Sequence, residues 1–265
     1  MSLRSFDRLQ FLGTGTSQGV PMIGCSCEVC RSEDSRDKRL RSSLWIRSEQ
    51  YSLLIDTSPD FRTQALRAGI QRLDAVLYTH AHADHLLGLD DLRCFCEKEN
   101  RAMPIYSHPE TLKQIQGVFP YAFFPKVRIS TYVQVDPIAV ELPFELGGWW
   151  ITPLKVEHGT IQTYGFLFER NGGKNFAYFS DCKQMSEEVI ERLKGIDYLI
   201  LDGLRKKPHP THLSHDEAVE VAQKVGAKQT YFTHITHHHS HQERERMIPH
   251  GLPISIAYDG FEIEL

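Results

Sequence analysis

Short apolar runs recur along the chain, rich in β-branched and aromatic residues and bounded by glycine, asparagine, aspartate or proline. This pattern is typical of β-strands. Strands are predicted at residues 9–12, 43–47, 51–56, 74–79, 103–106, 149–156, 164–168, 176–181, 197–202, 229–233, 254–258 and 261–265. Apolar residues at helical spacing predict helices at residues 59–69, 110–117, 186–194 and 214–225, and one from residue 86 to about residue 97. Helices between groups of strands predict a layered α/β fold, and the lack of a long linker or repeat predicts one domain over residues 1–265.

Turn signals predict how several strands are joined. The glycine-rich segment at residues 171–173 separates two strand-like runs and predicts a hairpin. Asp259 and Gly260 separate the last two runs of the chain and predict a second hairpin. Ser214, with Glu217 three residues later, predicts a capped helix start.

Composition narrows the function classes. The 265 residues carry a formal net charge of −4, which argues against a long nucleic-acid partner but leaves room for a small anionic substrate. No run is long and apolar enough to span a bilayer, so no membrane partner is expected. The first seven residues lack the apolar stretch of a secretory leader, so a cytoplasmic location is expected. The sequence is compatible with a homodimer.

The highest density of potential metal ligands follows the apolar run 74–79, where His80, His82, Asp84 and His85 fall within six residues. Strand-like alternation places His80, His82 and Asp84 on one side. The next apolar run starts a helix, so His85 lies where the backbone turns. Such a turn can aim two histidines at one cation, and a carboxylate and a histidine at a second. Imidazole and carboxylate ligands suit Zn²⁺, Mn²⁺ or Fe²⁺.

Four more residues share one pattern, in which a strand-like run ends at a potential ligand: His158, Asp181, Asp202 and His234. Each signal is weak alone, because a histidine or aspartate after a strand is commonly a turn residue. Strand ends at one edge of a sheet can converge, so together with the His80 cluster these residues indicate a cleft.

The H-x-H-x-D-H segment at residues 80–85, followed by His158, Asp181 and His234, resembles the ligand set of the metallo-β-lactamase superfamily. The resemblance implies an αβ/βα sandwich, with two mixed sheets face to face and helices outside. It also implies which residues hold two divalent ions, Mn²⁺ or Zn²⁺. One metal would be bound by His80, His82 and His158, the other by Asp84, His85 and His234, with Asp181 bridging the two. Asp56 resembles the aspartate of the superfamily that accepts an imidazole N–H and fixes the ligand tautomer.

A second metal signature is the C-x-C-x-x-C segment of Cys25, Cys27 and Cys30. In a reducing compartment, clustered cysteines point to metal before disulfide. Structural zinc takes four tetrahedral ligands, so a fourth must come from elsewhere. The candidates are His237, His238, His239 and His241. Three cysteines and one histidine would form a closed, structural zinc site.

The glycine-rich segment 13–21, with the cysteines that follow, resembles the phosphoribosyl cyclic phosphodiesterase family of phosphonate breakdown. That resemblance implies a structural zinc completed by the histidine three residues after the last active-site ligand, which is His237 here. The same pattern resembles the pyrroloquinoline-quinone biosynthesis branch, in which the H-x-H-x-D-H cluster is degraded. The cluster is intact here, which favours the phosphodiesterase family.

The predicted function is a dinuclear metal-dependent hydrolase, a phosphodiesterase acting on a small cyclic or nucleotide-like phosphate ester. Paired cations would activate a water for in-line attack on phosphorus. His212 is the candidate donor to the leaving group, with His215 as an alternative, and backbone N–H groups of residues 13–19 are expected to add anion contacts. The candidate catalytic residues are therefore His212 and the metal ligand Asp84. The alternatives are a thioester or lactone hydrolase on the same site, or a non-enzymatic binder of a phosphorylated ligand.

Overall fold

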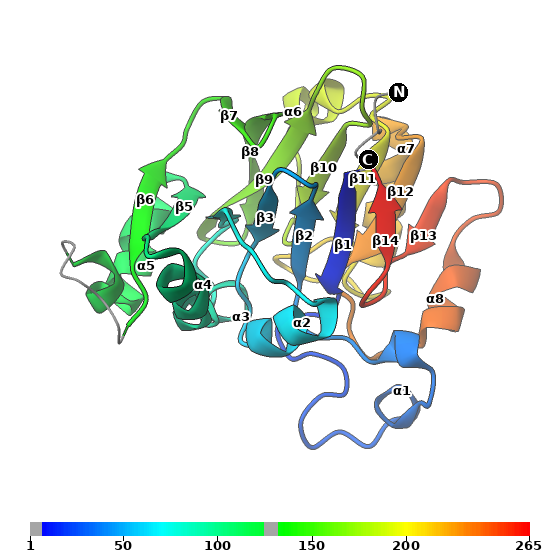
Figure 1. The fold of residues 1–265 in the computed structure, drawn as a ribbon. Coiled ribbons are helices and arrows are strands. Elements are labelled where there is room, and N and C mark those ends of the chain that lie inside the picture. Colours follow the sequence, from blue (N-terminus) through cyan, green and yellow to red (C-terminus); the bar gives the residue numbers. More distant parts are fainter. Residues whose placement is uncertain (1–6, 125–131) are drawn as a thin grey trace, which may run out of the picture.

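Two seven-stranded sheets form the centre of the protein in a computed structural model that describes residues 7–124 and 132–265 (Figure 1). Residues 1–6, on which the expectation of a missing leader rests, lie outside the described ranges. The first sheet runs in the order β14 (Glu262–Glu264), β1 (Arg8–Gly13), β2 (Ser43–Arg47), β3 (Ser52–Ile55), β4 (Ala75–Leu77), β5 (Met103–Ser107), β6 (Val135–Ala139). The second runs in the order β13 (Ile254–Ile256), β12 (Gln229–Thr233), β11 (Tyr198–Asp202), β10 (Phe176–Phe179), β9 (Ile161–Glu169), β8 (Trp149–His158), β7 (Phe144–Leu146).

Three apolar clusters hold the layers together. The central cluster joins the facing sides of the two sheets, with Phe11 and Leu53 from the first packed with Phe166 and Ile200 from the second. The outer face of each sheet has its own cluster with helices. The arrangement is helix, sheet, sheet, helix, so the predicted αβ/βα sandwich is confirmed.

Helices cover the outer faces of both sheets. The described α-helices are α1 (Glu28–Arg31), α2 (Phe61–Ala68), α3 (Ala83–Leu86), α4 (Arg93–Glu99), α5 (Pro109–Val118), α6 (Glu187–Arg192), α7 (His215–Val225) and α8 (His241–Met247). The start of α7 is the predicted capping box, in which Ser214 and Glu217 satisfy each other's backbone N–H groups. Such a cap contributes about 1 kcal/mol, and α7 buries Ala218 and Ala222 against the second sheet.

The single helix predicted from residue 86 to about residue 97 is wrong. The segment consists of α3, a 3₁₀ turn η2 (Leu89–Leu92) and α4. Gly88 explains the break, because its N–H donates to Thr57 O at 3.0 Å and an added Cβ would lie 2.1 Å from Ser58 O. The chain must pass close to the 57–58 backbone here, which a continuous helix with side chains does not allow.

The hairpin predicted at the end of the chain is also wrong. β13 pairs in parallel with β12 in the second sheet, whereas β14 pairs antiparallel with β1 in the first. The Asp259 carboxylate accepts hydrogen bonds from the N–H and hydroxyl of Thr14 and from Leu40 N, at 2.8–2.9 Å. These bonds anchor the crossing from one sheet to the other.

The sheet pairing brings several chain segments to one edge. β3 and β4 are parallel, so the residues after them, including Asp56 and His80, leave the first sheet at the same edge. β10, β11 and β12 are mutually parallel, and β8 runs parallel to β10 because both are antiparallel to β9. The ends of these four strands lead to His158, Asp181, Asp202 and His234.

Within the described residues, no helix has the length and apolar character needed to cross a membrane.

Candidate metal centre

The first group of potential ligands gathers two histidines that follow β4 with one from the end of β8. His80 Nε2 lies 2.9 Å from His82 Nδ1, and His158 Nε2 lies 3.3 Å from the same atom. Asp181 Oδ2, after β10, is 3.6 Å from His158 Nε2 and 4.0 Å from His80 Nε2. Ligand atoms 2.0–2.1 Å from a tetrahedral zinc are separated by about 3.3 Å. The four atoms therefore have the spacing of a metal site.

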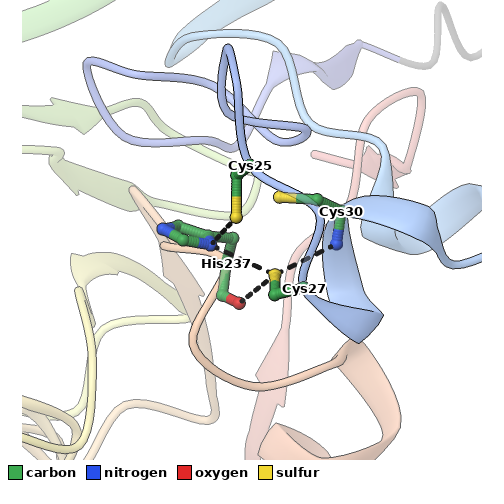
Figure 2. Close-up of side chains that lie close together, drawn as sticks. All are labelled: Cys25, Cys27, Cys30 and His237. Atoms are coloured by element: carbon green, nitrogen blue, oxygen red, sulfur yellow. Dashed lines mark hydrogen bonds between the residues drawn. The ribbon is translucent and has the colours of Figure 1, made fainter.

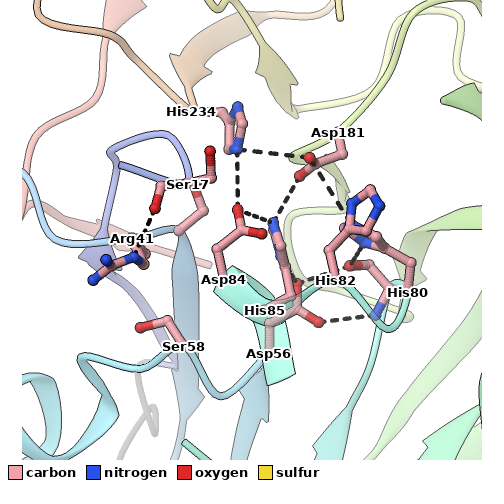
Figure 3. Close-up of polar contacts among 12 residues, drawn as sticks. Ser17, Arg41, Asp56, Ser58, His80, His82, Asp84, His85, Asp181 and His234 are labelled. Atoms are coloured by element: carbon pink, nitrogen blue, oxygen red, sulfur yellow. Dashed lines mark hydrogen bonds and ion pairs between the residues drawn. The ribbon is translucent and has the colours of Figure 1, made fainter. Parts of the chain in front are cut away.

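The second group, of Asp84, His85 and His234, lies against Asp181 of the first (Figure 3). His85 Nε2 lies 3.3 Å from Asp84 Oδ2 and 3.0 Å from Asp181 Oδ1. His234 Nε2, after β12, is 3.7 Å from Asp84 Oδ2 and 3.6 Å from Asp181 Oδ2. Asp181 thus reaches both groups, as the resemblance implies for a bridging ligand.

The strand-like alternation expected for His80, His82 and Asp84 is wrong. β4 ends at Leu77, and α3 begins at Ala83 with His82 as its N-cap residue. The change of backbone direction places Asp84 with His85 and separates it from His80 and His82. The division into two histidines and a carboxylate–histidine pair follows the turn, as expected.

Hydrogen bonds on the side away from the ligand atoms orient three of the histidines. Asp56 Oδ2 accepts from His85 Nδ1 at 2.8 Å, and His80 Nδ1 donates to the Thr79 hydroxyl at 2.9 Å. His158 Nδ1 donates to Thr211 O at 2.7 Å. Each of these three rings therefore has a proton on Nδ1 and directs Nε2 toward the ligand groups. The position of Asp56 agrees with the role that the resemblance implies.

Two residues of the site adopt left-handed backbone conformations that non-glycine residues rarely take. Asp56 has φ 62° and His234 has φ 58°. Such conformations cost about 1–3 kcal/mol each and persist where surrounding interactions fix them. At Asp56 the fixing bonds come from Thr79, whose N–H and hydroxyl donate to the carboxylate at 2.9 and 2.8 Å.

Burial and charge prepare the groups for a cation. Burial lowers the pKa of His80, His82 and His158, so these rings are neutral at pH 7. Burial acts to raise the pKa of Asp181, but His234 and His85 hold it well below the ordinary value. These three imidazoles and Asp181 are therefore in the forms that ligate metals. Burial acts to lower the pKa of His85, but Asp181, Asp84 and Asp56 hold it well above the ordinary value, so a metal would displace a proton from this ring.

Unsatisfied buried atoms test whether a metal fits. Within the described ranges, His85 Nε2, His234 Nε2 and Asp181 Oδ1 are buried without a hydrogen-bond partner. Leaving such atoms unpaired is costly, and all three face the ligand groups. A divalent cation would satisfy them together, and the nitrogen and oxygen donor set suits Zn²⁺, Mn²⁺ or Fe²⁺.

His212 lies beside the ligand groups. Its Nδ1 donates to Asp202 Oδ2 at 2.6 Å, and its ring stacks on His234 with centroids 4.7 Å apart. Its Nε2 is 3.9 Å from Asp181 Oδ2. The Asp202 carboxylate also accepts from Cys182 N at 3.0 Å, so it orients His212. Asp202 is the last residue of β11, and the end of a strand-like run made it a candidate ligand in the sequence. Its contact with His212 could not be predicted from spacing.

The other histidine of that segment, His215, points elsewhere. Its ring packs edge-on against Phe232 with centroids 5.7 Å apart. Burial lowers its pKa to about 4. Of the two histidines considered for the leaving group, His212 is the one at the centre.

A separate group joins the cysteine loop to the segment after β12 (Figure 2). Cys25 Sγ and Cys27 Sγ lie 3.5 and 3.3 Å from His237 Nδ1. Cys30 is in the same group, and its buried thiol has a pKa raised to about 11, mainly by burial. The hydrogen bond with His237, followed by that from Cys30 N, lowers the pKa of Cys27 to about 6. The donor set is that of a closed zinc site.

The neighbouring histidines have other surroundings. His238 Nδ1 lies 2.8 Å from the Thr236 hydroxyl, and His241 Nδ1 is 3.1 Å from the Arg39 guanidinium. Neither His238, His239 nor His241 belongs to the cysteine group in the described structure.

Backbone hydrogen bonds within the protein occupy several N–H groups of the glycine-rich loop. Gly15 N donates to Leu40 O, Thr16 N to Ile235 O and Gly19 N to Thr16 O, at 2.8–3.2 Å. The expectation that the loop amides contact an anion is therefore wrong for these three. The loop instead holds the segment that carries His234.

Comparison with known proteins agrees with this geometry. Residues 51–235 match the family described as "Beta-lactamase superfamily domain". The chain belongs to the metallo-β-lactamase superfamily. The match spans Asp56 and every residue of the two His/Asp ligand groups.

Among superfamily members, the chain is similar to a solved structure entitled "Crystal Structure of a New Diphosphatase from the PhnP Family", with 42% sequence identity and a TM-score of 0.89, over 98% of this chain and 97% of that one. It is 39% identical to an octanoyltransferase of Porphyromonas gingivalis over 96% of its length, but it spans about half (51%) of that protein. It is also 30% identical to the coenzyme PQQ synthesis protein B of Methylorubrum extorquens (strain PA1), over 82% of this chain and 76% of that protein.

Proposed function

We propose that this superfamily member is a metal-dependent hydrolase that cleaves a small phosphate diester. The observation that carries the proposal is the pair of adjoining His/Asp groups, with Asp181 of the first group 3.0 Å from His85 Nε2 and 3.6 Å from His234 Nε2 of the second. His80, His82 and His158 would hold one divalent ion, Asp84, His85 and His234 a second, and Asp181 both. When bound, two such ions neutralise the charge of a phosphate ester and lower the pKa of a water to near neutrality.

The residues of the chain supply orientation and a proton path. Asp56, Thr79 and the Thr211 carbonyl fix the ligand rings from behind, so that the donor atoms need no rearrangement on binding. The catalytic role we assign to Asp84 is to hold the second ion beside the reacting phosphate. His212, oriented by Asp202 through Nδ1, is positioned to take a proton at Nε2 from the attacking water and to pass it to the leaving oxygen.

His212 favours oxygen esters, phosphate diesters among them, over thioesters. An alkoxide leaving group needs a proton, whereas a thiolate leaves without one, so an oriented histidine beside the centre suits the first. The similarity to a protein described as a diphosphatase supports phosphate chemistry as well. The octanoyltransferase name belongs to a protein twice as long, so it gives weak support to acyl chemistry here.

The Cys25, Cys27, Cys30 and His237 group is proposed to bind a structural zinc. Its four donors leave no open position for a substrate. The shared central core supports one domain, and we propose a small phosphorylated substrate rather than a long nucleic acid.

Hydrolysis of bis(p-nitrophenyl) phosphate with Mn²⁺ or Zn²⁺ tests the proposal, beside a thioester and a lactone. Preferential cleavage of the phosphate diester is expected. Faster cleavage of the thioester or lactone would replace the proposal with acyl hydrolysis. Bound metal without turnover of any of the three would replace it with a binding role.

A further inference from the structure

The loop between β11 and α7 carries a guanidinium that no carboxylate neutralises within the described ranges. Arg205 Nε donates to Lys207 O at 3.2 Å and one terminal nitrogen donates to Pro208 O at 3.5 Å. These contacts fix the side chain on its own loop and leave its charge in place. The adjacent Lys206 differs, because it pairs with Asp216 at 2.6 Å.

His209, four residues later, presents an N–H donor. Its Nδ1 accepts from the N–H and lies 3.2 Å from the hydroxyl of Thr211. A nitrogen that accepts a hydrogen bond carries no proton, so the neutral ring has its hydrogen on Nε2. No protein atom in the described part of the chain pairs with that Nε2, and it is not among the buried unsatisfied atoms, so solvent reaches it.

His209 adjoins His212, and the Arg205 guanidinium contacts the carbonyl of Pro208, the residue before His209. The ring of His209 lies 5.1 Å from the ring of His212. Burial lowers the pKa of His209 to about 4, with further lowering by His212, Arg205, His158 and Lys183. Of these groups, Arg205 and Lys183 carry a positive charge at pH 7, in a place beside the group that faces the leaving oxygen.

We propose that Arg205 and His209 form an anion subsite that binds a phosphate on the leaving group. The inference rests on the proposed function and names its substrate class, a diphosphate diester cleaved between its two phosphorus atoms. A leaving phosphate would lie next to His212 and against a fixed cation and a fixed N–H donor. Charge-assisted hydrogen bonds of this kind are about twice as strong as neutral ones.

The reaction balances with water alone. The oxygen of one water bonds to the attacked phosphorus, and the bond from that phosphorus to the bridging oxygen breaks. The bridging oxygen keeps the electron pair and leaves on the second phosphate. The two protons of the water end one on each phosphate monoester, the second by way of His212.

Two substrates separate the subsite from the metal centre. Diadenosine diphosphate leaves AMP, whereas thymidine 5′-(p-nitrophenyl phosphate) leaves a nitrophenol without a phosphate. Arg205→Gln is expected to raise KM for diadenosine diphosphate roughly 10- to 100-fold. It should change kcat/KM for the nitrophenyl ester less than about threefold. His209→Ala is expected to raise the first KM about 10-fold, and His209→Gln, which keeps a donor near Nε2, should recover most of it.

Lys207→Gln is the matched control, because it removes one exposed positive charge from the same loop and keeps the backbone carbonyl that Arg205 contacts. If Lys207→Gln raised KM for diadenosine diphosphate as much as Arg205→Gln, the effect would come from the total positive charge of the loop. That result would overturn the subsite. Equal losses on the two substrates would overturn it too. A wild type that cleaves the nitrophenyl ester but not diadenosine diphosphate would sink this inference and leave the proposed function standing.

A calorimetric titration with AMP decides the subsite without turnover. The metal-loaded wild type should bind AMP, and Arg205→Gln should bind it at least about 10-fold more weakly, with Lys207→Gln unchanged. Cleavage of neither substrate would reject the proposed function, and the titration would still test the subsite. Absent AMP binding, or equal binding by wild type and Arg205→Gln, would overturn the inference.

Discussion

The two candidate metal regions are built differently. The His/Asp centre takes its donors from strand ends of both sheets, and His80, His85, Asp181 and His234 are almost completely buried. Two further residues form hydrogen bonds to rings of this centre on the side away from the ligand atoms, Asp56 to His85 and Thr79 to His80. The cysteine group takes three donors from one loop and one from a second, and Cys25, Cys27 and His237 are partly exposed.

This difference indicates what each region depends on. The sheets place the first set of donors, so the fold should exist without its metals and the metals should serve chemistry. The cysteine loop has only the short α1 as regular structure near its thiols, so a zinc there would fasten the loop to the segment after β12. Removing a ligand should therefore affect turnover in the first region and stability in the second.

The largest expected effect on turnover is that of His82→Ala. The ring supplies one donor of the first group and is only partly buried, so its removal should spare the fold. We expect hydrolysis of bis(p-nitrophenyl) phosphate to fall at least about 10³-fold, because the hydroxide-generating ion is lost. Elemental analysis should show less metal at the centre while the cysteine-bound zinc remains. His250→Ala removes an exposed histidine as the control. Full turnover in the His82→Ala variant would show that the first group of candidate ligands takes no part in the reaction.

His212→Ala should have the next largest effect. General acid catalysis contributes about 10²–10⁴-fold where the leaving oxygen needs a proton. For a phosphate diester with an alkoxide leaving group, we therefore expect kcat to fall by about 10²-fold or more with metal content retained. His215→Ala is the control from the same segment; it empties space beside Phe232 and should lower thermal stability with kcat little changed. A larger loss of kcat in the His215 variant would transfer the assignment to that residue.

The ligands could be predicted from the sequence because they come in a dense cluster and at strand ends. His80, His82, Asp84 and His85 lie within six residues, and spacing alone marks them as unusual. The two-sheet sandwich came from the resemblance carried by that cluster. The orientation of His212 by Asp202 could not be predicted, since it depends on the parallel register of β10, β11 and β12.

Predictions from short sequence windows were wrong where a residue makes a contact with a segment far away in the sequence. Asp259 and Gly260 have the composition of a hairpin turn, yet Asp259 binds Thr14 and Leu40, more than 200 residues away in the sequence. The helix predicted after His85 breaks at Gly88 because the 57–58 backbone lies against it. Neither partner is visible within a short sequence window.

Asp56→Asn sharpens the role of the residues behind the ligands. Three donors, from His85 and from the N–H and hydroxyl of Thr79, converge on the two carboxylate oxygens. An amide offers one oxygen, so one donor must face an NH₂ group. Asparagine tolerates the left-handed backbone at φ 62°, so the fold should persist. We expect Mn²⁺ affinity or activity to fall about 10- to 100-fold. Asp136→Asn, an exposed change on β6, is the control, and equal affinity in both variants would contradict the role.

Cys27→Ser should have the smallest effect on turnover and still lower stability. Cys27 caps α1 by accepting from Cys30 N at 3.4 Å, and serine is a good cap, so the change removes the metal donor and keeps the turn. We expect loss of one zinc and a fall in Tm of about 4–8 °C, the equivalent of roughly 2 kcal/mol in a domain of this size. Turnover should change less than about threefold.

The small effect on turnover is expected because the segment that carries His234 is also held by Ile235, whose backbone bonds to Thr14 and Thr16 at 2.8 and 3.2 Å. Cys94→Ser, at an exposed cysteine outside the group, should leave both zinc content and Tm unchanged. If Cys27→Ser instead abolished turnover with the fold intact, the two regions would be one functional unit, and the contrast between them would be wrong.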